Sequence, residues 1–158
     1  MIAPMTQEIL LALLGFAFVT SVTPGPNNMM LLASGVNFGL RRTVPHMLGI
    51  SLGHAAMVFL VGLGLAQVFT RVPVAMTVLK VISVAYMLWL AWKIATAAAP
   101  GQGQATGRPF TFVQAAAFQW VNPKAWAMAL GAVAAYAPGG TVGAYALLAV
   151  VFAAVNLP

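Results

Sequence analysis

The stretch Thr-Pro-Gly-Pro-Asn-Asn at residues 23–28 has the residue types and spacing to form a binding site. A proline lacks the amide hydrogen and interrupts a helix, so Pro24 and Pro26 leave the carbonyl groups of residues 20 and 22 without helical partners. A helix that restarts at Pro26 begins with amide groups, those of residues 27–29, that have no helical acceptor. This predicts a broken helix whose carbonyl and amide groups suit a ligand with one ammonium and one carboxylate group.

The same stretch also allows a structural reading. It could be a proline kink whose freed groups are bonded by Ser and Thr side chains and by neighbouring helices. Two prolines, a glycine and two asparagines in one short stretch favour the binding site. The expected substrate-binding residues are Thr20, Ser21, Thr23, Pro24, Gly25, Pro26, Asn27, Asn28, Asn122 and Lys124.

Lys124 follows a second proline, Pro123, in another apolar run. Charges inside a membrane-spanning helix are costly and are usually functional, so Lys124 could hold a substrate carboxylate. Two structural readings stand equally well beside this one. The side chain could extend toward the membrane surface, or its ammonium could bind the carbonyl of Gln119 that Pro123 frees.

His54 lies deep in an apolar run and is a candidate proton carrier, although a hydrogen-bonded packing role explains it equally well. His46 lies roughly 12 Å from it along a straight helix, so the two histidines cannot share one metal ion. The chain has no cysteine and a single acidic residue, Glu8. We therefore expect no metal site and no cofactor.

These residues belong to a chain of 158 residues that is 62% hydrophobic and only 5% charged. Soluble chains carry about 25% charged residues, so the composition predicts an integral membrane protein with the lipid bilayer as its main partner. The apolar runs do not alternate as transmembrane barrel strands do, which predicts an all-α polytopic helix bundle. The few basic residues lie near the ends of apolar runs and do not indicate nucleic acid binding.

About five membrane helices are expected, two of them broken by proline. Their residue ranges are 8–22 with 26–36, 44–66, 74–95, 110–136, and a fifth that begins near residue 142. Loops are expected at residues 37–42, 67–73, 97–109 and 137–140. The fifth apolar run is barely long enough to span a bilayer, so the chain reads as a fragment or a truncated version of a longer protein.

The two proline breaks indicate an internal repeat. An odd number of helices separates them, so the breaks face the membrane in opposite senses, as in inverted-repeat transporters. The single transmembrane domain, residues 1–158, would contain a first three-helix repeat at residues 1–96 and an incomplete second repeat at residues 110–158. A complete protein would then have six helices.

Arginines and lysines set the expected orientation. Arg41, Arg42, Lys93 and Arg108 belong to the first and third loops or lie next to them, whereas the second loop holds Arg71 alone. Because positive charges favour the cytoplasm, we expect the first and third loops inside and the N-terminus outside.

Two glycine pairs have the spacing that lets membrane helices pack closely. They are Gly35 with Gly39, and Gly49 with Gly53. Both pairs are expected to lie in helix contacts and not in a ligand site.

The sequence also resembles a known family, the LysE/RhtB-type amino-acid exporters (lysine exporter and homoserine/threonine efflux). The resemblance is strongest in Ser-Val-Thr-Pro-Gly-Pro-Asn at residues 21–27, continues at residues 39–42 and 48–54, and returns at 122–124 and 155–158. It implies a multi-pass protein of the bacterial inner membrane that exports amino acids or related small zwitterionic metabolites. It also implies coupling of export to the proton gradient.

Two other classes stay open beside the exporter. A membrane-embedded enzyme lacks suitable groups here, so we expect no enzyme activity. A structural or assembly subunit would have a flat, dry interface at Pro24, whereas a transporter would have a polar cavity there. The substrate is expected to be neutral because no acid is available to pair with a basic side chain, and alanine at Thr23 or Asn27 is expected to impair efflux. Assembly into a homo-oligomer is left open.

Overall fold

The computed structural model describes residues 5–96 and 107–157, and these form helices and connecting turns without a β-strand. The elements are α1 (Gln7–Val22), α2 (Pro26–Phe38), α3 (Leu40–Leu60), a π-helical turn (Val61–Leu65), α4 (Ala66–Arg71), α5 (Pro73–Ala95), α6 (Phe112–Phe118), a 3-10 turn (Gln119–Val121), α7 (Pro123–Tyr136) and α8 (Val142–Asn156). The all-α helix bundle predicted from the sequence is confirmed.

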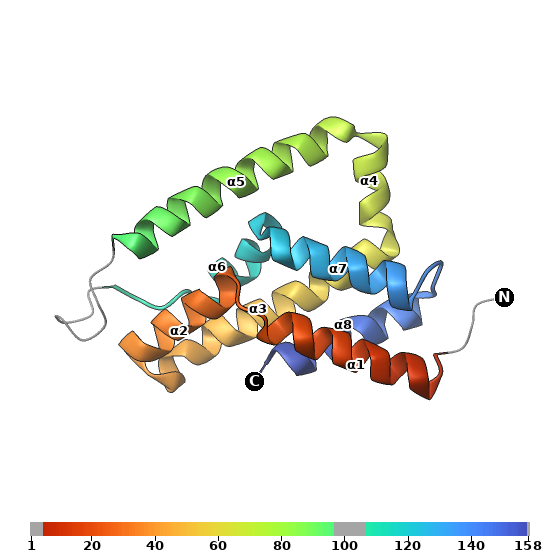
Figure 1. Cartoon of the computed structure of the whole chain (residues 1–158), viewed down its shortest axis with the longest axis horizontal. Coiled ribbons are helices and arrows are strands. Elements are labelled where there is room, and N and C mark those ends of the chain that lie inside the picture. The colour runs from red at the N-terminus through yellow and green to blue at the C-terminus, as the bar shows by residue number, and fades with distance from the viewer. Residues whose placement is uncertain (1–4, 97–106, 158) are drawn as a thin grey trace.

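Helix α3 is the central element of the bundle, packed against α2, α6, α7 and α8, while α1 lies along α7 and α8 (Figure 1). The core is built from small and large apolar residues of α1, α3, α7 and α8. Its most enclosed members include Leu13, Ala17, Met57, Val58, Ala129, Ala132, Leu148 and Phe152. Close packing of this kind holds each helix face in one position.

Both predicted helix breaks are present. Helices α1 and α2 meet at an angle of 60° across residues 23–25, and Pro26 occupies the first turn of α2. Helix α6 ends in the 3-10 turn, Asn122 is extended, and Pro123 opens α7. Each restart uses a proline where its missing amide hydrogen costs nothing.

Glycines bring α3 and α6 into close contact. A Cβ atom on Gly49 would lie 2.4 Å from the carbonyl oxygen of Phe112, and one on Gly53 would lie 2.6 Å from the Cα of Ala116. The expected packing role of this pair is therefore confirmed. It is wrong for Gly35 and Gly39, where an added Cβ would meet nothing within 4 Å.

Two of the expected loops are much shorter than the sequence indicated. The range 37–42 contains one non-helical residue, Gly39, whose φ of 78° turns the chain between α2 and α3. The range 67–73 is helical up to Arg71, because the chain already bends at Gly64, where φ is 116°. The turn at residues 137–140 is confirmed. Of the expected loop at 97–109, residues 97–106 lie outside the described part of the chain.

By length and composition, two helical segments could cross a membrane. They are the stretch from Leu40 to Arg71 and the stretch from Pro73 to Lys93, and the bent pair α1–α2 would be a third. Helix α8 is apolar but shorter. Part of the predicted multi-pass arrangement is thus present. The count of five spans, the inverted repeat and the orientation stay predictions.

Helix α5 stands apart from the other helices and is joined to them through α4 and the 3-10 turn (Figure 1). Only 6% of its most apolar stretch is buried. Between α5 and α7 lies a groove of about 710 Å³ with an almost entirely apolar lining. The outer surface of α5 is therefore of the kind that faces lipid.

Candidate functional site

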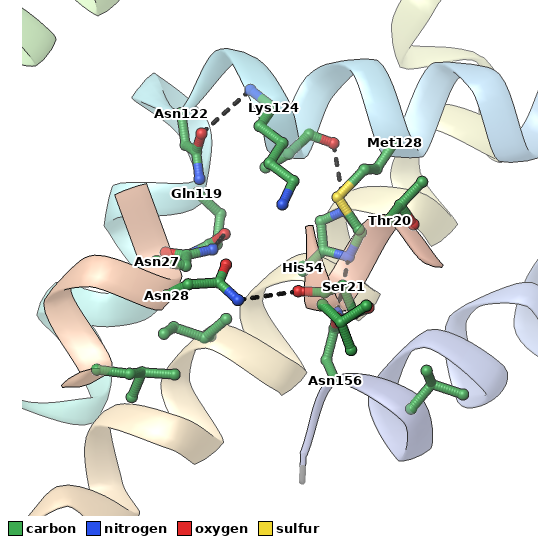
Figure 2. Close-up of a pocket in the computed structure, with 15 residues that line it drawn as sticks. Thr20, Ser21, Asn27, Asn28, His54, Gln119, Asn122, Lys124, Met128 and Asn156 are labelled. Atoms are coloured by element: carbon green, nitrogen blue, oxygen red, sulfur yellow. Dashed lines mark hydrogen bonds between the residues drawn. The ribbon is translucent and has the colours of Figure 1, made fainter. Parts of the chain in front are cut away.

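The two helix breaks meet around one polar cavity of about 150 Å³, shown in Figure 2. Helices α3 and α8 complete its wall. The lining residues are Thr20, Ser21, Val22, Asn27, Asn28, Leu31, Ile50, His54, Gln119, Asn122, Lys124, Ala125, Met128, Val155 and Asn156. Residues far apart in the sequence thus surround one space of molecular size.

At the first break, the threonine hydroxyl groups are bonded within α1. Thr20 Oγ1 donates to the carbonyl of Phe16 at 2.7 Å, and Thr23 Oγ1 donates to that of Val19 at 2.5 Å. Pro24 leaves the carbonyl of Thr20 without a helical donor. At the start of α2, the amide of Met29 bonds Gly25 O at 3.1 Å. Two amides, on residues 27 and 28, therefore remain without a helical acceptor, and the expectation that Met29 adds a third is wrong.

At the second break, Asn122 is almost fully buried and caps α7, since its Oδ1 accepts from the amide of Lys124 at 3.1 Å. The main-chain amide of Asn122 donates to the carbonyl of Gln119 at 3.2 Å. The carbonyl of Gln119 is thus bonded by Asn122 and not by the Lys124 ammonium, so that structural reading of Lys124 is wrong.

The Lys124 side chain instead crosses to the first break. It extends from α7 into the space between the broken helices (Figure 2), and its Nζ donates to the carbonyl of Thr23. Gly25 makes room for it, because a Cβ there would lie 2.8 Å from Lys124 Cδ. A charged donor on a main-chain carbonyl is one of the stronger hydrogen bonds a protein makes.

A pair of amide side chains also joins the two breaks. Asn27 Nδ2 donates to Gln119 Oε1 at 2.9 Å, and Gln119 Nε2 donates to Asn27 Oδ1 at 3.1 Å. Gln119 Nε2 also reaches the carbonyl of Ala115 at 3.0 Å and is fully buried. The reciprocal pair fixes the start of α2 against the end of α6.

On the opposite wall, His54 connects α3 to α7 and α8. Its Nε2 lies 3.2 Å from the carbonyl of Ala125, and its Nδ1 lies 3.2 Å from Nδ2 of Asn156. Asn156 Oδ1 in turn accepts from the hydroxyl of Ser21. Asn28 Nδ2 then bonds the carbonyl of Ser21 at 3.1 Å, so the chain of bonds ends at the start of α2.

The cavity brings together most, but not all, of the expected residues. Those that line it are Thr20, Ser21, Asn27, Asn28, His54, Asn122 and Lys124. Four others shape the break without lining the cavity: Thr23, Pro24, Gly25 and Pro26. Thr23 takes part through its main-chain carbonyl.

Sequence reasoning missed the side chains of Gln119 and Asn156 as site residues. Gln119 lies just before a proline break, and Asn156 is a polar residue at the end of the apolar helix α8. Polar residues in otherwise apolar helices were the available signal.

The other histidine is outside the site. His46 is buried on α3 against Phe110, with 5.4 Å between ring centroids, and neither ring nitrogen has a hydrogen-bond partner within the described residues. In the same part of the chain, no three His, Cys, Asp or Glu side chains come close enough to hold a metal ion. The acidic residue Glu8 is exposed in the first turn of α1.

The cavity therefore combines one ammonium group, main-chain amides and carbonyls, and neutral polar side chains. Among its described lining residues there is no carboxylate. Of the carbonyls at residues 20–23, those of Ser21 and Thr23 are bonded by protein donors, which leaves those of Thr20 and Val22. Helix breaks with such exposed dipoles in an apolar bundle are typical of membrane transporters.

Comparison with known proteins identifies the family. The family model for LysE type translocators matches residues 9–156, and the chain belongs to this family. Curated relatives named cysteine/O-acetylserine efflux protein include Escherichia coli proteins at 36% and 35% identity and one of Shigella sonnei at 35%. Each match extends over 123 residues, 76% of this chain and 61% of the relative, so the chain spans about three fifths of the relatives' length. No solved structure matches the chain.

Proposed function

We propose that this protein exports small neutral amino acids across the bacterial inner membrane in exchange for protons. The observation that carries this proposal is the polar cavity at the meeting point of two broken helices. Membership of the LysE type translocator family and the efflux function in the names of its relatives support it. In this proposal the full protein is multi-pass.

The substrate carboxylate binds beside Lys124 and the two amides at the start of α2. That end of the cavity carries a positive side chain and a positive helix terminus. The substrate ammonium binds the carbonyls of Thr20 and Val22, which have no helical donor. Both charges of a zwitterion then find a partner in one small space.

Cavity size supports a small substrate. A protein cavity of about 150 Å³ holds a ligand of roughly the size of benzene. The volume here is about 150 Å³, which suits an amino acid with a short side chain. The relatives are named for cysteine and O-acetylserine, which are small and uncharged in their side chains. The lack of a carboxylate among the described lining residues argues further for a neutral side chain.

His54 is the proton carrier in this proposal, because it is buried, lines the cavity and bonds across three helices. Histidine is the side chain whose ordinary titration falls nearest neutral pH.

Efflux measurements test the proposal. Cells that express the full-length protein should accumulate O-acetylserine or cysteine in the medium faster than cells without it. Lys124→Gln removes the proposed charged hydrogen bond to the substrate carboxylate, which is worth about 1.5–3 kcal/mol. Efflux at low substrate concentration should therefore fall about tenfold to hundredfold. Lys80→Gln is the matched control, since Lys80 is exposed on α5 and does not line the cavity. Normal efflux by Lys124→Gln, or no amino-acid efflux by the parent across all amino acids, would overturn the proposal.

A polar cavity at the break also bears on the alternative of a structural subunit. That reading expects a flat, dry interface at Pro24, and the lining here is rich in amide and hydroxyl groups. The family description as translocators agrees with transport and not with an enzyme.

A further inference from the structure

We propose that Asn156 is a positioning residue that carries the protonation state of His54 to Ser21 at the helix break, so that a proton and the substrate ammonium compete. This inference rests on the proposed function and names the residues that couple proton binding to substrate binding. It starts from the hydrogen bonds of three side chains on three different helices, α1, α3 and α8.

The bonds fix the direction of every donor in the neutral state. A carbonyl only accepts, so the His54 Nε2 that faces Ala125 O carries the hydrogen. In a neutral imidazole the other nitrogen, Nδ1, must then accept, and it accepts from Asn156 Nδ2. The amide of Asn156 therefore turns its Oδ1 toward Ser21, whose hydroxyl donates to it. Each bond of the chain has a donor and an acceptor with one tautomer and one amide orientation.

Protonation of His54 breaks this arrangement at one point. Both ring nitrogens then carry hydrogens, and Nδ1–H faces the two hydrogens of Asn156 Nδ2. The amide satisfies the cation when it turns over, so that Oδ1 accepts from His54 and Nδ2 points at Ser21. Ser21 Oγ then changes from donor to acceptor. Two buried donors that face each other without an acceptor are unfavourable, and this drives the turn of the amide.

The consequence reaches the end of the cavity where the substrate ammonium binds. Ser21 lies between Thr20 and Val22, the residues whose carbonyls have no helical donor. In the neutral state the Ser21 oxygen keeps lone pairs for an ammonium donor. After protonation one lone pair is occupied by Asn156, and a positive charge stands one side chain away. Both changes weaken ammonium binding, as an exchanger of protons for amino acids requires.

The neighbouring titratable groups do not share this role. Among the elements packed against α3, the helices α2 and α6 and the 3-10 turn carry none. Helix α7 contributes Lys124, which bonds Thr23 O, and Tyr136, whose ring packs against that of Phe16 at an interplanar angle of 52°. Helix α8 contributes Tyr145, which lies against Gly62. The remaining titratable groups of α3 are Arg41, Arg42 and His46, and none of them lines the cavity.

The test measures binding of O-acetyl-L-serine and proton movement in vesicles with the purified full-length protein, at a series of pH values. For the parent, competition by one proton predicts that affinity falls about tenfold per pH unit below the midpoint. Asn156→Ala interrupts the chain of bonds and leaves only the direct repulsion by the charged His54, so affinity should fall by clearly less than tenfold per pH unit over the same range. In Asn156→Asp the new carboxylate can only accept hydrogen bonds and favours the protonated His54. The midpoint of the pH dependence of affinity should therefore move about 1–3 units to higher pH.

His54→Gln provides a second independent variant. A glutamine amide can donate to Ala125 O and accept from Asn156 Nδ2, which imitates the neutral histidine. Its affinity should be independent of pH, and substrate addition should move no protons. A glutamine variant that keeps the parent's pH dependence would overturn the proposal.

Ser51→Ala is the matched structural control. Ser51 Oγ donates to the carbonyl of Ala153 at 2.6 Å, so it also joins α3 to α8 but does not line the cavity. This variant should lower thermal stability and leave the pH midpoint in place. A merely structural Asn156 would behave like Ser51, with Asn156→Ala and Asn156→Asp keeping the parent's pH profile, and that result would also overturn the proposal. If the parent itself binds and moves no amino acid, the proposed function fails and not the coupling alone.

Discussion

At the scale of single residues, Gly25 decides how closely Lys124 approaches the broken helix. Gly25 has an extended backbone that any residue adopts, with φ of −167°, so its lack of a side chain and not its flexibility is what matters. A Cβ there would lie 2.8 Å from Lys124 Cδ and 3.2 Å from Nζ. The absence of a side chain at Gly25 therefore leaves room for the side chain of Lys124 from the other break.

Gly25→Ala should displace the Lys124 ammonium from the carbonyl of Thr23. The ammonium then no longer lies where the substrate carboxylate is proposed to bind. Because a charged hydrogen bond to that carboxylate would contribute about 1.5–3 kcal/mol, substrate affinity should fall about tenfold or more. The measurement is substrate binding by the purified variant, with its amount in the membrane as a check of folding. Gly35→Ala is the control, since an added Cβ there meets nothing within 4 Å. Equal affinities of the two variants would refute the role given to Gly25.

Thr23 and Asn27 are expected to differ, although the sequence alone predicted impairment from both. The Thr23 hydroxyl is bonded back to Val19 O, so Thr23→Ala should keep most efflux. Asn27→Ala removes both bonds to Gln119 and leaves a buried amide without its partner, a cost of about 1–3 kcal/mol. Initial efflux rates at matched expression distinguish the two. Loss in Thr23→Ala equal to that in Asn27→Ala would contradict this assignment.

At the scale of elements, the contact between α3 and α6 sets the position of the second break. Gly49 and Gly53 let the two helices approach until backbone meets backbone. Because α6 leads directly into the 3-10 turn with Gln119, this contact also holds one wall of the cavity.

Gly49→Ala should destabilise the bundle by about 1–3 kcal/mol, since its Cβ would meet a main-chain oxygen at 2.4 Å and the helices must separate. Thermal unfolding in detergent measures the loss. Gly15→Ala on α1 is the matched control, because nothing lies within 4 Å of its added Cβ. A variant at Gly49 as stable as the control would show that the helices are not in close contact.

At the scale of the whole molecule, the two breaks form one unit although about a hundred residues lie between them. Lys124 bonds Thr23, and Asn27 bonds Gln119, beside one cavity. If the proposed export proceeds by alternating access, the two breaks must move relative to each other. We therefore predict that the bonds between the breaks change during a transport cycle.

Cross-linking tests this movement, and the 158 residues of this chain contain no cysteine that would compete for the reagent. In a variant with Asn27→Cys and Gln119→Cys, a short bifunctional thiol reagent that can be cleaved by reduction should join α2 to the 3-10 turn. Efflux should fall to the level of empty cells and return after cleavage. Each single substitution with the same reagent is the control, compared with its own untreated rate. Undiminished efflux in a fully cross-linked sample would show that the two halves need not separate.

The sequence by itself determined the local elements. Proline lacks an amide hydrogen, so the breaks at Pro24 and Pro123 follow from residue type. An apolar composition with few charges likewise predicted an all-α membrane bundle. The positions of bends at glycine were harder to predict from the sequence. Gly39 and Gly64 bend the chain through positive φ angles, which the sequence does not reveal.

Only the tertiary structure decided which groups meet. From the sequence, Lys124 could bind a substrate carboxylate, extend toward the membrane surface or bond the carbonyl of Gln119. The bond to Thr23 at the other break was not among these readings, because it depends on helix packing across about a hundred residues. The same holds for His54, whose partners Ala125 and Asn156 come from two other helices. Hydrogen bonds are directional and short-ranged, so their pairing is settled by the close packing of α3 against its neighbours and not by the order of residues.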